Sequence, residues 1–254
     1  MIITIFIIGT IFGSFFNVCI ARLPKGESII YPPSNCTKCH NKLKWYDLLP
    51  LISYVIIKGR CRYCKEKISY RYFAFEFLSG IMFLAIYLKY GYQLITLKFI
   101  VLFSFLFIIS IIDLDTTNVY LCTTLPGIIS GIIFIAINIF YKNHIYGYLF
   151  AAFLYSGVIV LINIITKKII DMPAFGSGDA EVLLMCGLFL GMKLGMFMLF
   201  ISFVLAGFVS IGLILLRIKD RMDYIAFIPF VAAASVITIL YGQNILDFYN
   251  KLIL

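Results

Sequence analysis

Two short stretches of this chain combine carboxylates with a change from apolar to polar sequence. The first, IIDLDTTN, ends a long apolar run and holds Asp113 and Asp115. The second, FGSGDAE, precedes another apolar run and holds Asp179 and Glu181. Ionisable side chains beside a hydrocarbon boundary are costly, so each is a candidate functional residue.

Carboxylates from two helices at the same depth can form an acid–base pair. Facing carboxylates share one proton, because like charges a few Å apart do not both ionise. One then deprotonates a water for attack on a peptide carbonyl, while the other protonates the carbonyl oxygen. The chain has only 2 histidines and no Gly-x-Ser-x-Gly or His-Glu-x-x-His motif. An aspartyl hydrolase and a transporter with a proton-relay pair both fit these residues.

Only one residue of each pair is expected to join a dyad, because positions i and i+2 of a helix face different ways. Asp113 is nearer the apolar run than Asp115 and is more easily desolvated. Asp179 follows Gly178, where the missing Cβ lets another backbone approach. Glu181 has a simpler role at a helix start, where it stabilises the positive end of the dipole. An ordinary helix cap would also explain Gly-Ser-Gly-Asp.

Four of the 7 cysteines form two Cys-x-x-Cys pairs in one polar loop: Cys36, Cys39, Cys61 and Cys64. Two such knuckles are typical of a structural zinc ribbon, in which four thiolates close a tetrahedral site. A reducing cytoplasm argues against disulfides, and a redox pair or a metal-free loop are the remaining alternatives. A loop of about 50 residues buries little core, so a metal would supply the missing folding free energy.

The composition predicts a membrane protein. The chain is 63% hydrophobic and 13% charged, with a mean hydropathy of +1.04, whereas soluble domains are roughly 45 to 50% apolar. Its apolar runs approach the length of about 20 residues that crosses a bilayer as a helix. We expect an all-α integral membrane protein with about eight transmembrane helices. The expected spans are Met1–Ile20, Phe73–Leu88, Leu94–Ile112, Leu125–Phe140, Tyr148–Ile165, Val182–Met192, Met196–Leu216 and Ile225–Tyr241.

The basic residues predict the topology. The net charge is +9, and 11 of the 21 Lys and Arg residues lie in residues 21–72, against 3 acids. Such a bias places this loop in the cytoplasm and the N-terminus outside. Counting spans from there puts both carboxylate pairs at cytoplasmic helix ends. Topology and anionic headgroups explain the basic loop, so we expect no nucleic-acid partner.

The topology divides the chain into three parts: a first transmembrane helix (residues 1–21), a cytoplasmic four-cysteine loop (22–72) and a transmembrane core (73–254). Glu76 lies just inside the second span and is a further candidate site residue, because a carboxylate there is costly. The remaining acids stand in charged loops or in the tail, where solvation or pairing accounts for them.

Taken together, these motifs resemble the prepilin peptidases, the bacterial type IV leader peptidases among the Gly-x-Gly-Asp membrane aspartyl proteases. GTIFGSFFNVCIARLPKG (residues 9–26) is similar to the family's Gly-Ser-Phe-x-Asn-Val…Arg-Leu-Pro opening. The cysteine loop, continuing through WYDLLPLISY to FEFLSG, looks like the family's zinc-ribbon region. IIDLD and FGSGDAEVLL stand where the family carries its catalytic aspartates.

The resemblance implies a catalytic pair, Asp113 and Asp179, with Gly176 and Gly178 shaping the second loop and the four loop cysteines binding zinc. The implied substrate is a prepilin or pilin-like precursor, whose basic leader is removed at the cytoplasmic face of the bacterial inner membrane. Many family members also methylate the new N-terminus with S-adenosylmethionine. The sequence shows no glycine-rich nucleotide cradle, so this cofactor rests on the resemblance alone.

The chain departs from the family pattern after the first aspartate pair. Val119-Tyr120-Leu121 stands where the family usually has Leu-Pro-Asp or Ile-Pro-Asn, and Phe73 stands where a proline is common. Neither change removes a proposed catalytic group or zinc ligand. The turn into the fourth span is expected to differ.

Two other classes of function fit parts of the sequence. A proton-coupled transporter with a zinc-ribbon loop would place its carboxylates near the bilayer midplane and would contain a discontinuous helix pair. A non-catalytic assembly component of a pilus or secretion machine would tolerate asparagine at both aspartates.

Overall fold

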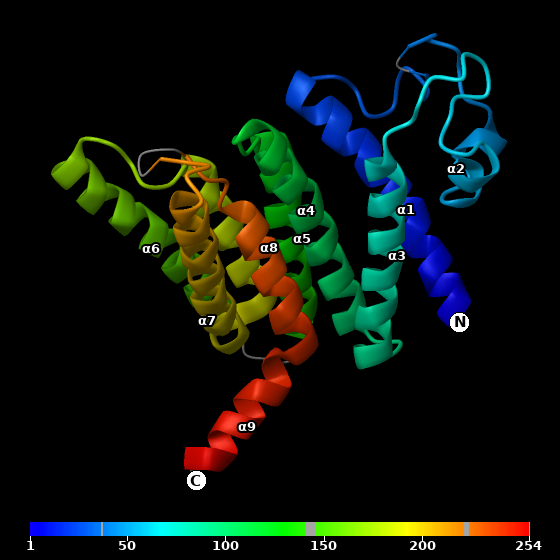
Figure 1. Cartoon of the computed structure of the whole chain (residues 1–254). Helices are drawn as coiled ribbons and strands as arrows, with labels where there is room; N and C mark the ends of the chain where they lie inside the picture. The colour runs from blue at the N-terminus through cyan, green and yellow to red at the C-terminus, as the bar shows by residue number, and fades with distance from the viewer. Residues whose placement is uncertain (37, 141–145, 221–223, 254) are drawn as a thin grey trace. The chain divides into compact units, whose positions relative to one another are not determined.

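The computed structural model describes residues 1–36, 38–140, 146–220 and 224–253, and these are almost entirely helical (Figure 1). Within these residues the only extended pairings are two isolated antiparallel bridges in the cysteine loop. The predicted all-α class is therefore confirmed. The chain forms two compact units, residues 1–96 and 97–254.

The first unit is built on two long helices, α1 (Ile2–Arg22) and α3 (Tyr70–Tyr90). Small residues line the contact between them: a Cβ added to Gly13 would lie 2.8 Å from the Cα of Glu76. Small residues let transmembrane helices approach closely, and this packing replaces the hydrophobic effect that lipid cannot supply.

The cysteine loop joins α1 to α3 and contains three short elements. These are the 3₁₀ turns η1 (Leu23–Lys25) and η2 (Trp45–Leu48) and the helix α2 (Ile52–Ile56). The Leu51 N–H, directly before α2, donates a hydrogen bond of 2.8 Å to Oε2 of Glu76 on α3. This bond ties α2 to the side of a membrane helix.

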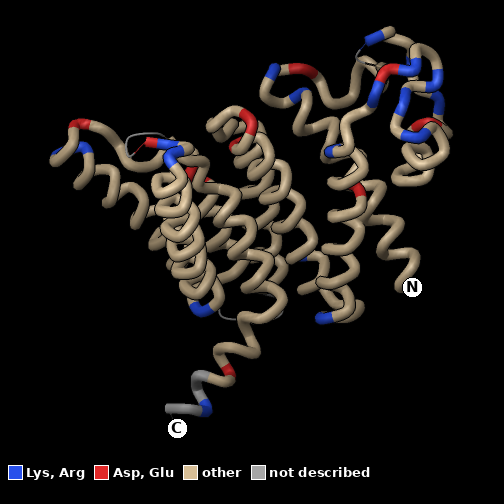
Figure 2. The backbone as a smooth tube through the Cα atoms, viewed as in Figure 1, with Lys and Arg blue, Asp and Glu red and all other residues tan. Residues whose placement is uncertain are grey.

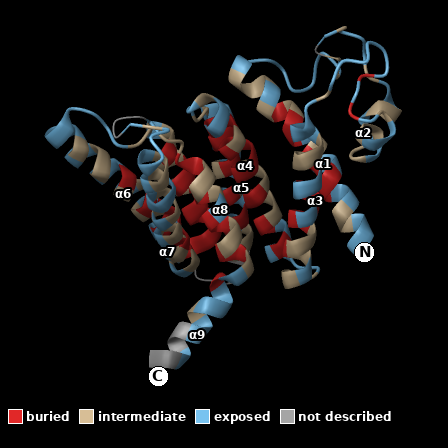
Figure 3. Ribbon diagram, in the orientation of Figure 1, coloured by how far each residue is buried: buried red, intermediate tan, exposed pale blue. Residues whose placement is uncertain are grey.

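The second unit is a helical bundle. Its helices are α4 (Leu94–Thr116, which begins at the boundary of the units), α5 (Leu121–Phe140), α6 (Tyr146–Ile170), α7 (Ser177–Leu215), α8 (Ile228–Ile237), the π-helical turn η3 (Thr238–Gly242) and α9 (Gln243–Ile253). Helix α7 packs against α5, α6 and α8. Buried residues concentrate where these helices meet (Figure 3). Large apolar side chains are exposed on the outer faces of the helices, as expected of a surface that contacts lipid.

Charged residues are sparse along the middle parts of the long helices, and Lys and Arg gather in the cysteine loop (Figure 2). Among the described residues, seven helices are long and apolar enough to cross a membrane. The sequence predicts about eight, and the difference comes from α7. The expected spans Val182–Met192 and Met196–Leu216 lie in this one helix and are counted together. Its backbone is non-helical at Gly191, which separates the two halves.

Helix α7 reverses its direction at that break. Gly191 adopts φ 67° and ψ −168°, which is not helical. An unbroken run of 39 residues would be about 58 Å long, whereas the chain from Leu215 to Tyr224 spans at most about 32 Å. The Tyr224 hydroxyl nevertheless lies next to Gly176, the residue before α7. The two ends of α7 meet because the chain turns back at Gly191.

Replacing Gly191 with alanine is expected to lower the free energy of unfolding by about 1–2 kcal/mol, because a left-handed backbone is costly for a residue with a Cβ. The added Cβ would also lie 3.0 Å from the Tyr148 ring. The matched control, Gly207→Ala in the same helix, has open space around its Cβ and should keep or raise the stability. Thermal unfolding in detergent compares the two variants, and equal midpoints would contradict the turn.

Candidate functional site

Asp113 lies in the last turn of α4 and is only 3% exposed. The helix ends at Thr116, and the next residue, Thr117, adopts a positive φ of 53° and donates its N–H to the Asp113 carbonyl at 2.8 Å. The N–H of Ile228, the first residue of α8, donates to Asp113 Oδ2 at 3.1 Å. The carboxylate therefore lies at the N-terminus of α8, where the helix dipole stabilises negative charge.

Asp179 is the third residue of α7 and is only 4% exposed. Its Oδ2 accepts the Gly176 N–H at 2.8 Å, so the helix cap considered from the sequence is present. This bond uses one carboxylate oxygen. In the described part of the chain, Oδ1 of Asp179 and Oδ1 of Asp113 have no hydrogen-bond partner. One oxygen of each carboxylate is thus left for water or substrate.

The two aspartates line one open pocket of about 350 Å³. The charge of Asp113 acts on Asp179, so the two carboxyl groups interact electrostatically. The other lining residues are Thr117, Asn118, Val119, Gly176, Ser177, Gly178 and Tyr224. Residues that are 66 positions apart in the chain, 113 and 179, share this pocket.

Gly178 packs against Val119, in the segment where the chain departs from the family pattern. A Cβ added to Gly178 would lie 2.4 Å from the Cβ of Val119. The linker between α4 and α5 therefore packs directly on the backbone of the loop that carries Asp179. Only a residue without a side chain fits there, which gives the Gly178 expectation a physical cause.

The loop before α7 is held by a residue that the sequence analysis missed. The Asn163 side chain on α6 donates to the Phe175 carbonyl at 2.9 Å and accepts the Phe175 N–H at 2.8 Å. The Phe175 ring packs edge-on against Phe227, with 4.9 Å between centroids. Phe227 directly precedes Ile228, the donor to Asp113. An asparagine inside an apolar helix is the signal that would have identified this support.

Tyr224 is a second residue that the sequence did not single out, because it stands in a charged loop without a motif. Its hydroxyl lies 3.0 Å from the position of a Cβ added to Gly176, at the edge of the pocket. Partial burial, together with the negative charge of Asp179, raises the pKa of the Tyr224 hydroxyl. The phenol therefore keeps its proton near neutral pH and is able to donate a hydrogen bond.

The other carboxylate candidates lie elsewhere. Asp115 is exposed and is not among the residues that line the pocket. Glu181 accepts a hydrogen bond of 2.6 Å from Thr124 Oγ1, so it connects the start of α7 to α5 in addition to its place near the helix dipole. Glu76 belongs to the first unit, where it binds the Leu51 N–H.

The four loop cysteines form a cluster in the first unit. Their sulfur atoms all lie within 4.8 Å of one another, and Cys36 Sγ is 3.8 Å from Cys64 Sγ. A tetrahedral zinc ion about 2.3 Å from each sulfur would hold the sulfurs about 3.8 Å apart. The cluster thus fits a four-thiolate metal ion, while no disulfide joins the described cysteines.

The two knuckles repeat one backbone pattern at an offset of 25 residues. The Cys36 N–H donates to the Asn41 carbonyl at 3.0 Å, and the Cys61 N–H donates to the Glu66 carbonyl at 2.8 Å. The N–H groups of Cys39 and Lys38 lower the pKa of the Cys36 thiol to about 6. Such a repeat is the folding pattern that two Cys-x-x-Cys pairs predict.

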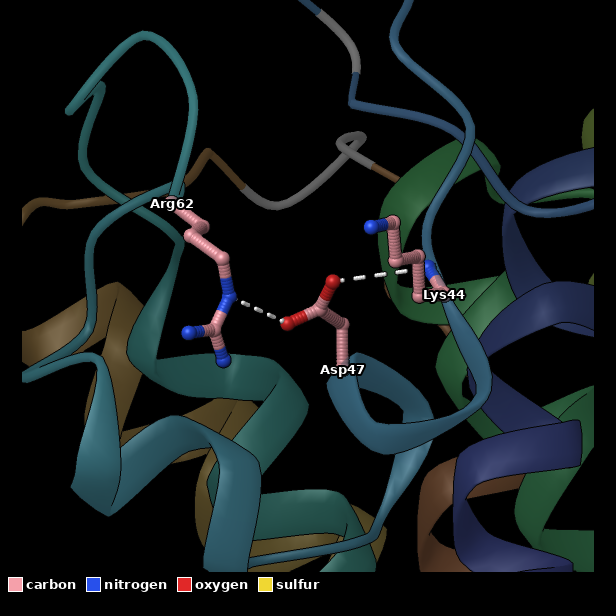
Figure 4. A network of polar contacts seen from close by, with 3 residues as sticks. All are labelled: Lys44, Asp47 and Arg62. Atoms are coloured by element: carbon pink, nitrogen blue, oxygen red, sulfur yellow. Dashed lines mark hydrogen bonds and ion pairs between the residues drawn. The ribbon is translucent and has the colours of Figure 1, made fainter.

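A polar contact joins the segment between the knuckles to the second knuckle (Figure 4). Asp47 Oδ1 accepts from Nε of Arg62 at 2.9 Å, and Asp47 Oδ2 accepts the backbone N–H of Lys44 at 3.4 Å. The Asp47 side chain is 4% exposed. An ion pair of this kind orients the loop around the cysteine cluster.

Comparison with known proteins gives a consistent result. The model "Bacterial Peptidase A24 N-terminal domain" matches residues 7–90, and the model "Type IV leader peptidase family" matches residues 100–211. The comparison with solved structures found no match.

The relatives carry the name "Prepilin leader peptidase/N-methyltransferase". The relative from Bacillus subtilis is 29% identical over 259 residues, covering 100% of both chains. The relative from Vibrio cholerae is 32% identical over 210 residues, covering 79% of this chain and 81% of the relative. The relative from Myxococcus xanthus is 33% identical over 189 residues, covering 73% of this chain but 55% of the relative. The predicted resemblance is confirmed, and the chain belongs to the type IV leader peptidase family.

Proposed function

We propose that this membrane peptidase removes the basic leader from prepilin-like precursors by activating water between Asp113 and Asp179. The observation that carries the proposal is one pocket with two buried carboxylates, each anchored through one oxygen by a backbone N–H. Family membership supports the substrate class. The lipid bilayer is the other partner, since the helices are long and apolar enough to cross the bacterial inner membrane.

In the proposed reaction the aspartates share one proton. The ionised carboxylate takes a proton from water as the water oxygen attacks the scissile carbonyl carbon, and the protonated one gives its proton to the carbonyl oxygen. Collapse of the tetrahedral intermediate breaks the C–N bond, and the leaving amine takes up a proton. The substrate helix must unwind locally, because a helical carbonyl is already hydrogen-bonded. No metal takes part in these steps.

The Tyr224 hydroxyl supplies a third polar group at the pocket. A protonated phenol donates to an oxyanion but does not compete with the aspartates for the proton of the water. We assign it the role of binding the carbonyl oxygen as negative charge develops there.

The positions of the aspartates argue against the transporter alternative. Asp113 lies in the last turn of α4, and Asp179 lies about 18 Å along α7 from the break at Gly191. A proton-relay pair would be expected near such a break, at the bilayer midplane. The scaffold alternative does not explain why two buried carboxylates share a pocket, since burying them is costly.

We propose that the cysteine loop (residues 22–72) is cytoplasmic, that the N-terminus is outside, and that the active site opens at the cytoplasmic face. The support is the basic loop, which holds 11 of the 21 Lys and Arg residues. We further propose that the four cysteines bind a structural zinc ion, since four thiolates leave no open position for catalysis.

The relatives' printed name makes methylation of the new N-terminus by S-adenosylmethionine a second candidate activity. In the described residues no strand leads into a helix through a glycine-rich turn. No residues are therefore assigned to that cofactor.

Replacing either Asp113 or Asp179 with asparagine is expected to lower prepilin cleavage by about 10⁴-fold, because an amide neither accepts nor gives the required proton. Asp115→Asn is the matched control and should retain activity, since Asp115 is exposed. Cleavage of a prepilin in isolated membranes measures all three. Full cleavage by either of the first two variants would refute the assignment.

Replacing Tyr224 with phenylalanine is expected to lower kcat by about 10- to 100-fold with little change in KM, because the lost hydrogen bond acts on the transition state. Tyr241→Phe is the control, since Tyr241 is exposed and lies outside the pocket. Cleavage kinetics with purified enzyme separate kcat from KM. An unchanged kcat in the Tyr224 variant would exclude the role.

Metal analysis of the purified chain is expected to give about one zinc per molecule. Cys61→Ser should lose the zinc and expose the loop to proteolysis, because the metal supplies folding free energy. Cys122→Ser, at an exposed cysteine outside the cluster, should keep it. A metal-free wild-type protein with reactive thiols would overturn the zinc proposal.

A further inference from the structure

Helix α2 presents an apolar face that no described residue of the first unit covers. Ile52 is 58% exposed, Val55 is 64% exposed and Ile56 is 66% exposed. Three neighbouring β-branched side chains in one short helix are a costly surface in water. A non-aqueous environment would remove this cost.

Contacts with α3 place α2 at the depth of the membrane interface. Glu76, which binds the N–H of Leu51, is the seventh residue of α3 and lies about 9 Å along the helix axis from its first residue, Tyr70. The Tyr54 ring packs on Phe73, with 5.4 Å between centroids. Helix α3 has 21 residues and is about 32 Å long, hardly more than the hydrocarbon core. Helix α2 therefore lies beside the part of α3 that enters the bilayer.

A cationic pocket continues from this apolar face. Its volume is about 470 Å³, and it is lined by Ile56, Ile57, Lys58, Arg60, Arg62 and Lys65. Arg62 is paired with Asp47. Within the described chain, Lys58, Arg60 and Lys65 form no ion pair with a carboxylate. Three basic residues without a carboxylate partner and two isoleucines thus line the same space.

We propose that this pocket binds the phosphate headgroup of an anionic phospholipid, with α2 inserted among the acyl chains next to it. The basic lining residues favour a phosphate, and Ile56 and Ile57 in the same lining favour a ligand with an apolar part. A nucleic acid satisfies the cations but leaves Val55 and Ile56 exposed. The inference stands on the first unit and does not depend on the proposed proteolysis.

The test uses the full chain in phosphatidylcholine nanodiscs. Trp45 is the only tryptophan, so Trp45→Phe with Ile56→Trp places one fluorophore at the pocket. Acyl-brominated phosphatidylglycerol or phosphatidylcholine is then added at equal mole fractions. Bromine quenches tryptophan only on close approach, so the ratio of the two quenching efficiencies reports headgroup preference at α2. Val55→Trp replaces the reporter if the first variant does not assemble.

We expect both lipids to quench, with phosphatidylglycerol enriched about fivefold or more at the reporter. Neutralising the pocket with Lys58→Gln, Arg60→Gln and Lys65→Gln should reduce the ratio to about one. The control variant removes the same charge from exposed lysines outside the pocket, Lys25→Gln, Lys42→Gln and Lys67→Gln, and should keep the preference.

Four results would overturn the proposal. Absence of quenching by both lipids would place α2 outside the bilayer, and equal quenching would remove the headgroup preference. Equal losses in the two triple variants would reduce the effect to net charge. Loss of the preference on adding inorganic phosphate or a DNA oligonucleotide at micromolar concentration would assign the pocket to that ligand.

Discussion

Hydrocarbon tolerates neither unpaired charges nor unpaired backbone groups, and this constraint decides where carboxylates can stand in such a chain. Asp113 and Asp179 occupy helix ends, where N–H groups that lack a helical partner are available. Ile228 and Gly176 provide those groups. The same bonds that make the carboxylates tolerable also fix their positions, so the proposed acid–base pair is held rigidly while one oxygen of each remains available.

Bringing the two helix ends together requires the turn at Gly191. Without it the end of α7 would lie far from its start, and Tyr224 would not reach Gly176. The loops are then connected by uncharged contacts, since Asn163 holds Phe175 and Phe175 packs on Phe227. Apolar packing and neutral hydrogen bonds thus hold the loops around the two aspartates in place. This suits a membrane protein, in which additional charges are costly. In the first unit, the cysteine cluster has the corresponding role for a loop without a core.

Much of this arrangement could be predicted from the sequence because its signals are strong. Long apolar runs predict helices, paired Cys-x-x-Cys motifs predict the cluster, and rare acids draw attention to Asp113 and Asp179. The sequence predicts two spans here and hence a reversal between Met192 and Met196, whereas the break lies at Gly191. The exact position of the turn is not readable from sequence, because glycine is common in membrane helices. Tyr224 and Asn163 were missed for a related reason. Their importance arises from tertiary contacts, and neither residue belongs to a motif.

The central claim is that Asp113 and Asp179 act as one unit, and single-turnover cleavage with excess enzyme tests it most directly. The rate is measured for Asp113→Asn, for Asp179→Asn and for the double variant. If the carboxylates share one proton and one water, the double variant should be no slower than the slower single variant, within about threefold. If the two losses multiply instead, the aspartates contribute independently, and the account of a shared dyad is wrong.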